Sequence, residues 1–337
     1  MFVCFKKNNT HFLNVLFLYC TRAQFKLLCR VGKIFFLPTC LIRKVKFVAM
    51  LSIVTFAFST TATAELVKRA AVVETVNGVP ISVFHVLRGE KKLEVFPTKV
   101  LQDGDWLCVR QPNNDLLKEK QNFVTLSFGG SQLETVTYDN SPYLVKKRDT
   151  APSIPENVIA ETETWFSSLF KHYLESVITI VRKEEASLSM PLLTKHQAKM
   201  VAGERILHLA WQGGNAPYWV QVFQGNAAFL VEMSYSKRVQ FEKRQLKAGH
   251  YRVVVNDADR QTIEGKFQVV ESLPLRLKQV EQEMKASTLS ERTKKTLFAA
   301  WLAQQKEGAW KFETYQRIAK IAKEYQPALL VRKALEK

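Results

Sequence analysis

The stretch from Leu207 to Val270 constrains the fold of this chain more than any other. Short apolar runs alternate there with turns that contain glycine, asparagine or aspartate. Alternate side chains of an extended strand point to the same face, so Leu207, Leu209 and Trp211 predict a strand with one buried face. Several such strands, separated by closely spaced turns, predict an antiparallel β-sandwich over residues 201–271.

Within this sandwich, Leu246, Gly249 and Tyr251 follow the spacing of a tyrosine corner. The pattern resembles immunoglobulin-like and fibronectin-type domains, in which the tyrosine hydroxyl bonds to backbone just upstream. The resemblance implies an immunoglobulin-like fold. It implies no activity, because such folds carry many unrelated functions.

A second set of short strands is predicted between residues 70 and 145, inside a domain spanning 65–148. Turn signals such as Asn-Gly and Asp-Gly-Asp separate the apolar runs, which predicts a small β-barrel or sandwich. The run 101–109, with its Gly-Asp turn before an apolar strand, resembles the periplasmic FecR-like domain. That resemblance implies an exported β module. It does not imply iron sensing, because the transmembrane anti-sigma arrangement of that family is not recognisable in this sequence.

A long amphipathic helix is predicted over residues 156–185, within a linking segment 149–200. Its apolar residues recur at three- and four-residue spacing, which places them on one helix face. We expect this face to pack between the two β modules. The alternatives are self-association as a coiled coil and a helix lying on a membrane. Acidic residues in the first turns, Glu161 among them, disfavour an anionic lipid surface.

Residues 272–337 are predicted to be helical. Thr288 and Glu291 can form a capping box, Gly308 ends the first helix, and Pro327 introduces a short last one. We interpret the segment as an αα-hairpin, which makes the chain an α+β multidomain protein. The order of motifs from residue 156 onward resembles an uncharacterised family of exported bacterial proteins.

Residues 1–64 form a leader whose export signal spans residues 43–64. A basic segment, an apolar run and small residues follow one another there, and the ending Ala62-Thr63-Ala64 predicts cleavage before Glu65. The alternative is an uncleaved inner-membrane anchor, but the apolar run is shorter than the ~20 residues that a spanning helix needs. Because export signals normally begin close to the N-terminus, we predict that translation starts near residues 41–45. The predicted location is the periplasm.

The net charge of +18 is partly a property of this leader. Residues 1–64 hold nine Lys or Arg and no acid, which leaves +9 on residues 65–337. That remainder contains no dense basic stripe interleaved with aromatic residues, so a nucleic-acid partner is not predicted. The remaining alternative is a solvated basic surface that contacts anionic envelope polymers or lipid. The membrane is otherwise involved only through the export signal.

No catalytic, cofactor-binding or metal-binding constellation is visible in the sequence. Only Cys108 lies beyond the leader, so an internal disulfide cannot form, and no Cys/His metal-ligand spacing occurs. We interpret Cys108 as an inert thiol in a strand. The pairs Asp103/Asp105 and Asp257/Asp259 are interpreted as turn residues, because calcium requires about six to eight oxygen ligands.

The candidate binding surface consists of Trp211, Tyr218 and Trp219. If Tyr218 packs inward, alternation places Trp219 outside, where its indole could stack on a sugar ring or on a partner's side chain. The alternative is a tryptophan covered by a helix.

We therefore predict a non-enzymatic exported interaction or scaffold protein with a protein or envelope-polymer partner. The alternative function is an envelope carbohydrate-binding protein or a hydrolase with a site that the sequence does not show. A histidine beside Cys108 or converging carboxylates would favour the hydrolase, and a flat aromatic patch would favour the binder.

Overall fold

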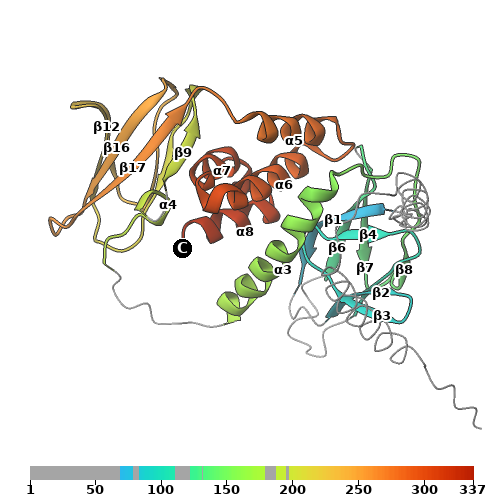
Figure 1. The fold of residues 1–337 in the computed structure, drawn as a ribbon. Coiled ribbons are helices and arrows are strands. Elements are labelled where there is room, and N and C mark those ends of the chain that lie inside the picture. The colour runs from blue at the N-terminus through green and yellow to red at the C-terminus, as the bar shows by residue number, and fades with distance from the viewer. Residues whose placement is uncertain (1–68, 79–82, 111–121, 131, 179–186, 195–196) are drawn as a thin grey trace, which may run out of the picture. The chain divides into compact units, whose positions relative to one another are not determined.

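The computed structural model describes residues 69–337 except for 79–82, 111–121, 131, 179–186 and 195–196. Val67–Lys337 forms one compact unit, and the predicted leader and export signal lie outside the described residues. The fold is α+β, with five sheets and six α-helices in the part of the chain that the structure describes (Figure 1). None of the described helices combines the length and the apolar character needed to cross a membrane.

The N-terminal module consists of two four-stranded antiparallel sheets, with strand orders β4-β1-β6-β7 and β3-β2-β5-β8. Over the described residues neither sheet closes on itself, so the barrel alternative is wrong. Strand alternation buries Val72, Val86, Leu107 and Leu126 completely, and these residues belong to one hydrophobic core. The strands are β1 (Arg69–Asn77), β2 (Phe84–Arg88), β3 (Lys91–Glu94), β4 (Val100–Gln102), β5 (Trp106–Val109), β6 (Phe123–Ser127), β7 (Leu133–Thr137) and β8 (Tyr143–Leu144).

The sandwich region contains one five-stranded sheet, in the order β13-β12-β16-β17-β9, and two two-stranded sheets, β10-β15 and β11-β14. All its pairs are antiparallel except β9 with β17. A parallel pair is possible there because the two strands lie at opposite ends of the region and need no tight connecting turn. The strands are β9 (Ala198–Val201), β10 (Gly203–Arg205), β11 (His208–Ala210), β12 (Tyr218–Gln224), β13 (Ala227–Ser234), β14 (Arg238–Gln240), β15 (Arg244–Leu246), β16 (Gly249–Asn256) and β17 (Thr262–Val270).

The hydrogen bond implied by the tyrosine corner is present. The Tyr251 hydroxyl donates to the Lys247 carbonyl at 3.0 Å and accepts from the Lys247 N–H at 3.2 Å. The ring is buried and stacks on Phe267, with 5.1 Å between the ring centroids. Tyr251 therefore anchors the start of β16 to the turn before it.

The long helix α3 (Glu156–Ile178) begins where the sequence predicts, and residues 179–186 lie outside the described residues. Its buried side chains are spaced four residues apart, at Val158, Thr162, Phe166 and Phe170. They pack against the C-terminal helices α6 (Glu291–Gln304) and α8 (Gln326–Leu335). The apolar stripe is thus covered within the chain over this length, and self-association through residues 156–185 stays a prediction.

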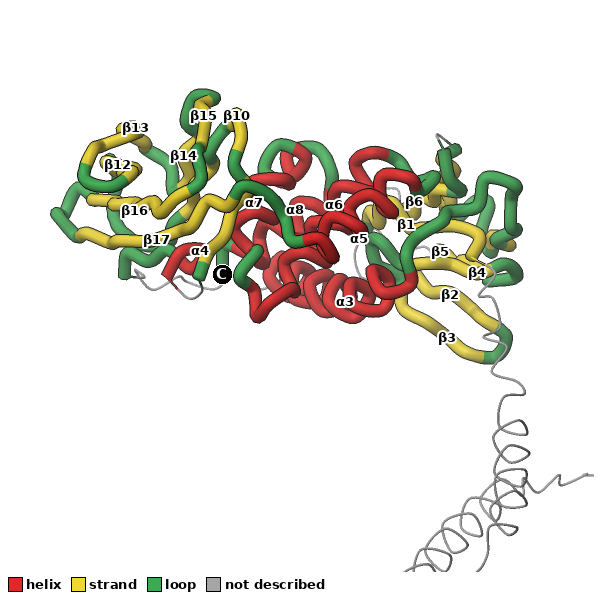
Figure 2. Tube along the Cα trace, turned by 45° about the horizontal axis from the view of Figure 1, so that its top comes forward, coloured by secondary structure: helices red, strands yellow, loops and turns green. Residues whose placement is uncertain are grey.

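The C-terminal region contains four α-helices, one more than the predicted αα-hairpin with its short last helix (Figure 2). A helix α5 precedes the predicted pair, because Ser287 and Ser290 adopt extended backbone angles that separate it from α6. The remaining helices and single turns are α4 (Pro191–Thr194), α5 (Leu275–Ala286), α7 (Lys311–Ile318) and the 3-10 turns Gln305–Gly308 and Ile321–Lys323.

The predicted capping box at Thr288 and Glu291 is also wrong. Ser290 caps α6, because its hydroxyl accepts the Thr293 N–H at 3.3 Å. Thr288 lies before the cap, and its hydroxyl instead donates to the Ala151 carbonyl at 3.3 Å. Serine at the position nearest the helix start satisfies the free N–H group that the capping box was expected to satisfy.

Candidate functional site

An apolar strip lies on the outer face of β12 and β13. Trp219 stands directly opposite Met233 in the antiparallel pair, and Gln221 stands opposite Val231, so all four side chains share one face. The exposed fractions are 45% for Trp219, 58% for Val231 and 49% for Met233. Tyr235, beyond the end of β13, is 74% exposed. The strip is contiguous because the outward apolar residues of the two strands lie at neighbouring positions of the paired ladder.

Alternation along β12 produces this arrangement. Tyr218, Val220 and Val222 point inward and are at most 2% exposed, which forces Trp219 and Gln221 outward. Polar residues of the next strand border the strip, because β16 places Arg252 and Asn256 beside β12. An apolar centre with a polar border is typical of a protein interaction surface.

Trp211 and Tyr218 do not belong to this surface, which corrects the candidate set. They are 3% and 2% exposed, and their rings meet edge to face with centroids 5.1 Å apart. The Tyr218 hydroxyl donates to the Gly214 carbonyl at 2.8 Å. Tyr218 therefore holds the Gly213-Gly214 turn from inside, and Trp211 packs against its ring. Of the three candidates, Trp219 alone is at the surface.

A row of three reactive side chains, which sequence reasoning missed, crosses the N-terminal module. His85 on β2 stands opposite Cys108 on β5 and opposite Glu94 on β3. Residues directly opposite in antiparallel strands share a face, so the three side chains form one line. No sequence signal could have shown this, because the pairing register brings together residues from three separate strands.

The surroundings of Cys108 and His85 favour a neutral thiol and a neutral imidazole. Burial raises the pKa of the Cys108 thiol, and burial together with Lys92 and Arg110 lowers the pKa of the His85 imidazole. A cysteine nucleophile requires the opposite shifts, a thiolate stabilised by a nearby cation. The row is therefore poorly suited to nucleophilic catalysis, although a histidine does lie beside Cys108.

A cavity of about 330 Å³ adjoins the row, between β2, β3 and α3. His85 lines it, is 5% exposed, and its Nδ1 has no hydrogen-bond partner among the described residues. Glu94, at the rim, pairs with the Lys171 ammonium at 3.0 Å and accepts a hydrogen bond from the Ser167 hydroxyl at 3.4 Å. The cavity thus offers one unpartnered ring nitrogen beside a rim whose carboxylate is already occupied.

The paired aspartates hold turns, as their sequence context indicates. Asp105 is 1% exposed and receives two hydrogen bonds from Arg88, at 2.9 and 2.8 Å. Asp257 accepts the backbone N–H groups of Gln261 at 2.8 Å and Asn215 at 3.1 Å. No group of three or more His, Cys, Asp or Glu that could hold a metal ion occurs among the residues that the structure describes.

His208 is partly buried at the contact between β11 and α7, whereas its sequence position suggests an outward side chain. The Gln316 amide holds its backbone, accepting the His208 N–H at 2.8 Å and donating to the His208 carbonyl at 2.8 Å. Burial, together with the nearby charges of Lys323 and Arg205, lowers the pKa of the imidazole to about 4. The folded protein therefore resists protonation at a site that the unfolded chain protonates near its ordinary pKa.

We expect His208 to make the protein less stable in mild acid. The unfolded state binds the proton first, so this histidine's contribution is fully present above about pH 6.5 and is lost as the pH falls toward about 4. After allowance for its partial exposure, the loss is about 1–2 kcal/mol. Urea denaturation at pH 7 and pH 4.5 should show a smaller difference for His208→Gln than for the unmodified chain. The exposed-site variant His250→Gln is the control, and equal pH dependence in all three proteins would contradict the prediction.

Comparisons with known proteins do not place the chain in a family. No family model and no curated protein matches it. Among solved structures, it is similar to the extracellular domain of a protein described as a one component system of B. thetaiotaomicron, with a TM-score of 0.20 and 8% identity. It is also similar to the extracellular domain of a hybrid two component system of the same organism, with a TM-score of 0.19 and 9% identity. These matches cover 59% and 53% of this chain, and 25% and 30% of those chains.

Proposed function

We propose that this chain is an exported, non-enzymatic interaction protein that binds a partner polypeptide through the outer face of β12 and β13. The observation that carries the proposal is the strip of Trp219, Val231 and Met233, which is exposed on β12 and β13 although the inward residues of β12 are buried. Contiguous apolar surface is costly in water unless a partner covers it. The signal pattern ending at Ala64 supports export to the periplasm with cleavage of the leader.

The position of β13 supports a specific mode of binding. Among the described residues β13 pairs only with β12, so its second edge is free to pair with an added strand. A partner segment in extended conformation would form main-chain hydrogen bonds with β13 and place alternate side chains on the apolar strip. Trp219, as a large amphipathic ring, would be the main anchor.

We also propose that the sandwich region is immunoglobulin-like. The central sheet of β12, β16 and β17, the parallel addition of β9, and the Tyr251 corner all support this assignment. The FecR-like assignment of the N-terminal module continues to rest on the Gly-Asp turn at residues 104–105. Both assignments concern the fold, and the function is proposed from the strip alone.

Replacing Trp219 with alanine should abolish partner capture and leave stability almost unchanged. The indole is 45% exposed, so its removal should change the free energy of unfolding by less than about 1 kcal/mol. Removal of a central aromatic anchor typically weakens binding by about 2 kcal/mol or more. The measurement is crosslinked capture of the tagged chain from the cell envelope, scored for a band that is lost in Trp219→Ala, together with thermal denaturation of both proteins.

Leu275→Ser is the matched control, because Leu275 is a large apolar residue that is 73% exposed on α5, outside the strip. It should retain the captured band. A Trp219→Ala protein that loses stability but keeps its partner would contradict the proposal. Competition by soluble envelope glycan would instead favour the carbohydrate-binding alternative, for which an exposed indole is also suitable.

A further inference from the structure

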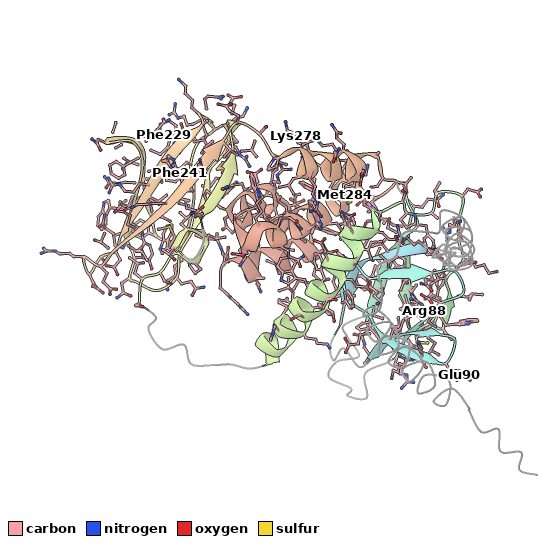
Figure 3. All side chains as sticks on the ribbon, in the orientation of Figure 1. Arg88, Glu90, Phe229, Phe241, Lys278 and Met284 are labelled. Carbon is pink, nitrogen blue, oxygen red and sulfur yellow. The ribbon has the colours of Figure 1, made fainter. Side chains whose placement is uncertain are left out.

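A second cavity of about 330 Å³ lies among the C-terminal helices, bordered by α5, α6, α7 and the turn Ile321–Lys323. Its floor is apolar, because Met284 and Phe298 line it and are themselves 1% and 3% exposed. Met284 lies on the inner side of α5, and the exposed Lys278 lies about one and two-thirds turns earlier on the same helix (Figure 3). The cavity is therefore built from side chains of well-packed helices.

The rim of this cavity carries an excess of positive charge. Five basic residues and two carboxylates line it, giving a formal charge of +3. They are Lys285, Lys294, Lys295, Arg317, Lys320, Glu281 and Glu291.

Three of the five cations already have partners. Arg317 is held by Glu281 at 2.7 Å and by Glu313 at 2.6 Å. Lys294 pairs with Glu291 at 3.2 Å, and Lys285 lies 3.6 Å from Glu281.

Lys295 and Lys320 are different, since neither has an ion pair or a side-chain hydrogen bond within the described part of the chain. Both are exposed at the mouth of the cavity, one on α6 and one just after α7. Two uncompensated ammonium groups thus stand beside an apolar floor. An anion bound there would gain charge-assisted hydrogen bonds without displacing an internal partner.

We propose that this cavity binds a small organic anion, with a carboxylate or phosphate held by Lys295 and Lys320 and an aliphatic or aromatic part on Met284 and Phe298. Its volume is about twice that of the ~150 Å³ cavity that holds benzene, and it lies at the lower end of the range for ligand sites. An inorganic anion would leave the apolar floor in water, and a cation would be repelled by the rim. The site lies on different elements from β12 and β13, so it does not depend on the proposed partner surface.

Octanoate titrated into the full chain by isothermal calorimetry tests this site. We expect saturable binding to one site that weakens as ionic strength rises, because the rim charges are exposed and are screened by salt. The double variant Lys295→Gln/Lys320→Gln should bind about tenfold more weakly. The double variant Lys278→Gln/Lys323→Gln removes the same charge from exposed positions outside the cavity and should bind like the unmodified chain.

Three results would overturn the proposal: no binding of either octanoate or octyl phosphate at millimolar concentration, equal weakening in both double variants, or inorganic phosphate binding as tightly as the octyl compound that binds. Octyl phosphate binding in place of octanoate would support it and would identify the head group. All the substituted lysines are exposed, so circular dichroism should show that both variants remain folded.

Discussion

Replacing Glu74 with alanine is expected to lower the free energy of unfolding by about 3 kcal/mol. Glu74 on β1 is fully buried, and its carboxylate accepts hydrogen bonds from the Tyr325 hydroxyl at 2.7 Å and the Thr293 hydroxyl at 2.5 Å. The alanine variant removes the buried carboxylate that both hydroxyls share as an acceptor, and it also opens a cavity. Burial and the charge of Glu74 raise the pKa of Tyr325 well above its ordinary value, so this hydroxyl stays a donor.

Urea denaturation of the full chain measures this effect. Glu74→Gln keeps the side-chain volume and one acceptor oxygen, so it should cost less than Glu74→Ala. Glu90→Ala removes an exposed carboxylate in the turn between β2 and β3 and should change stability by less than about 0.5 kcal/mol. If Glu74→Ala is as stable as Glu90→Ala, the buried network does not contribute to stability.

Replacing Glu313 with alanine is expected to have a similar or larger effect, about 3–4 kcal/mol. Glu313 on α7 is 1% exposed and pairs with Arg205 at 3.0 Å and with Arg317 at 2.6 Å. It also accepts the backbone N–H of Val201 at 3.0 Å, at the end of β9. Removing it leaves two guanidinium groups and a backbone donor without their shared acceptor, which is the costly way to break a buried ion pair.

The control for Glu313 is Glu283→Ala, because Glu283 is an exposed carboxylate on the neighbouring helix α5. Thermal denaturation at pH 7 should separate the two variants clearly. Arg205→Ala removes only one of the two partners and should lie between them. A Glu313→Ala protein with unchanged stability would show that water reaches this contact and solvates both arginines.

Sequence patterns predicted the local structure well where one physical rule dominated. Period-two alternation located β12 and β16, helical spacing located α3, and the Leu246-x-x-Gly249-x-Tyr251 pattern predicted a hydrogen bond that the structure contains. The same alternation correctly placed Trp219 outside and Tyr218 inside. These rules work because each depends on residues close together in the chain.

Features that depend on distant residues could not be predicted. The two short strands β4 and β8 have too few residues for a pattern, and they exist because neighbouring strands pair with them. The cap at Ser290 was not predicted, and its hydroxyl also donates to the distant Glu74 carboxylate at 3.2 Å. The line of Glu94, His85 and Cys108 likewise depends on strand register, which a single sequence does not determine.

The predicted binding surface wrongly included Trp211 and Tyr218, which are buried. Trp211, Tyr218 and Trp219 were grouped as one aromatic cluster, but a strand separates neighbouring residues to opposite faces. The basic cavity among α5, α6 and α7 was missed because its lysines are scattered along three elements and look like ordinary solvated residues in sequence.

The contact between β1 and α8 determines when this chain can finish folding. The Gln326 amide accepts the Val76 N–H at 3.1 Å and donates to the Val76 carbonyl at 3.0 Å, across 250 residues of sequence. A polypeptide that emerges from a ribosome or a secretion channel N-terminus first therefore presents an incomplete first module until its final helix has emerged. Until then, the Val76 N–H and carbonyl lack the partner that the folded chain gives them.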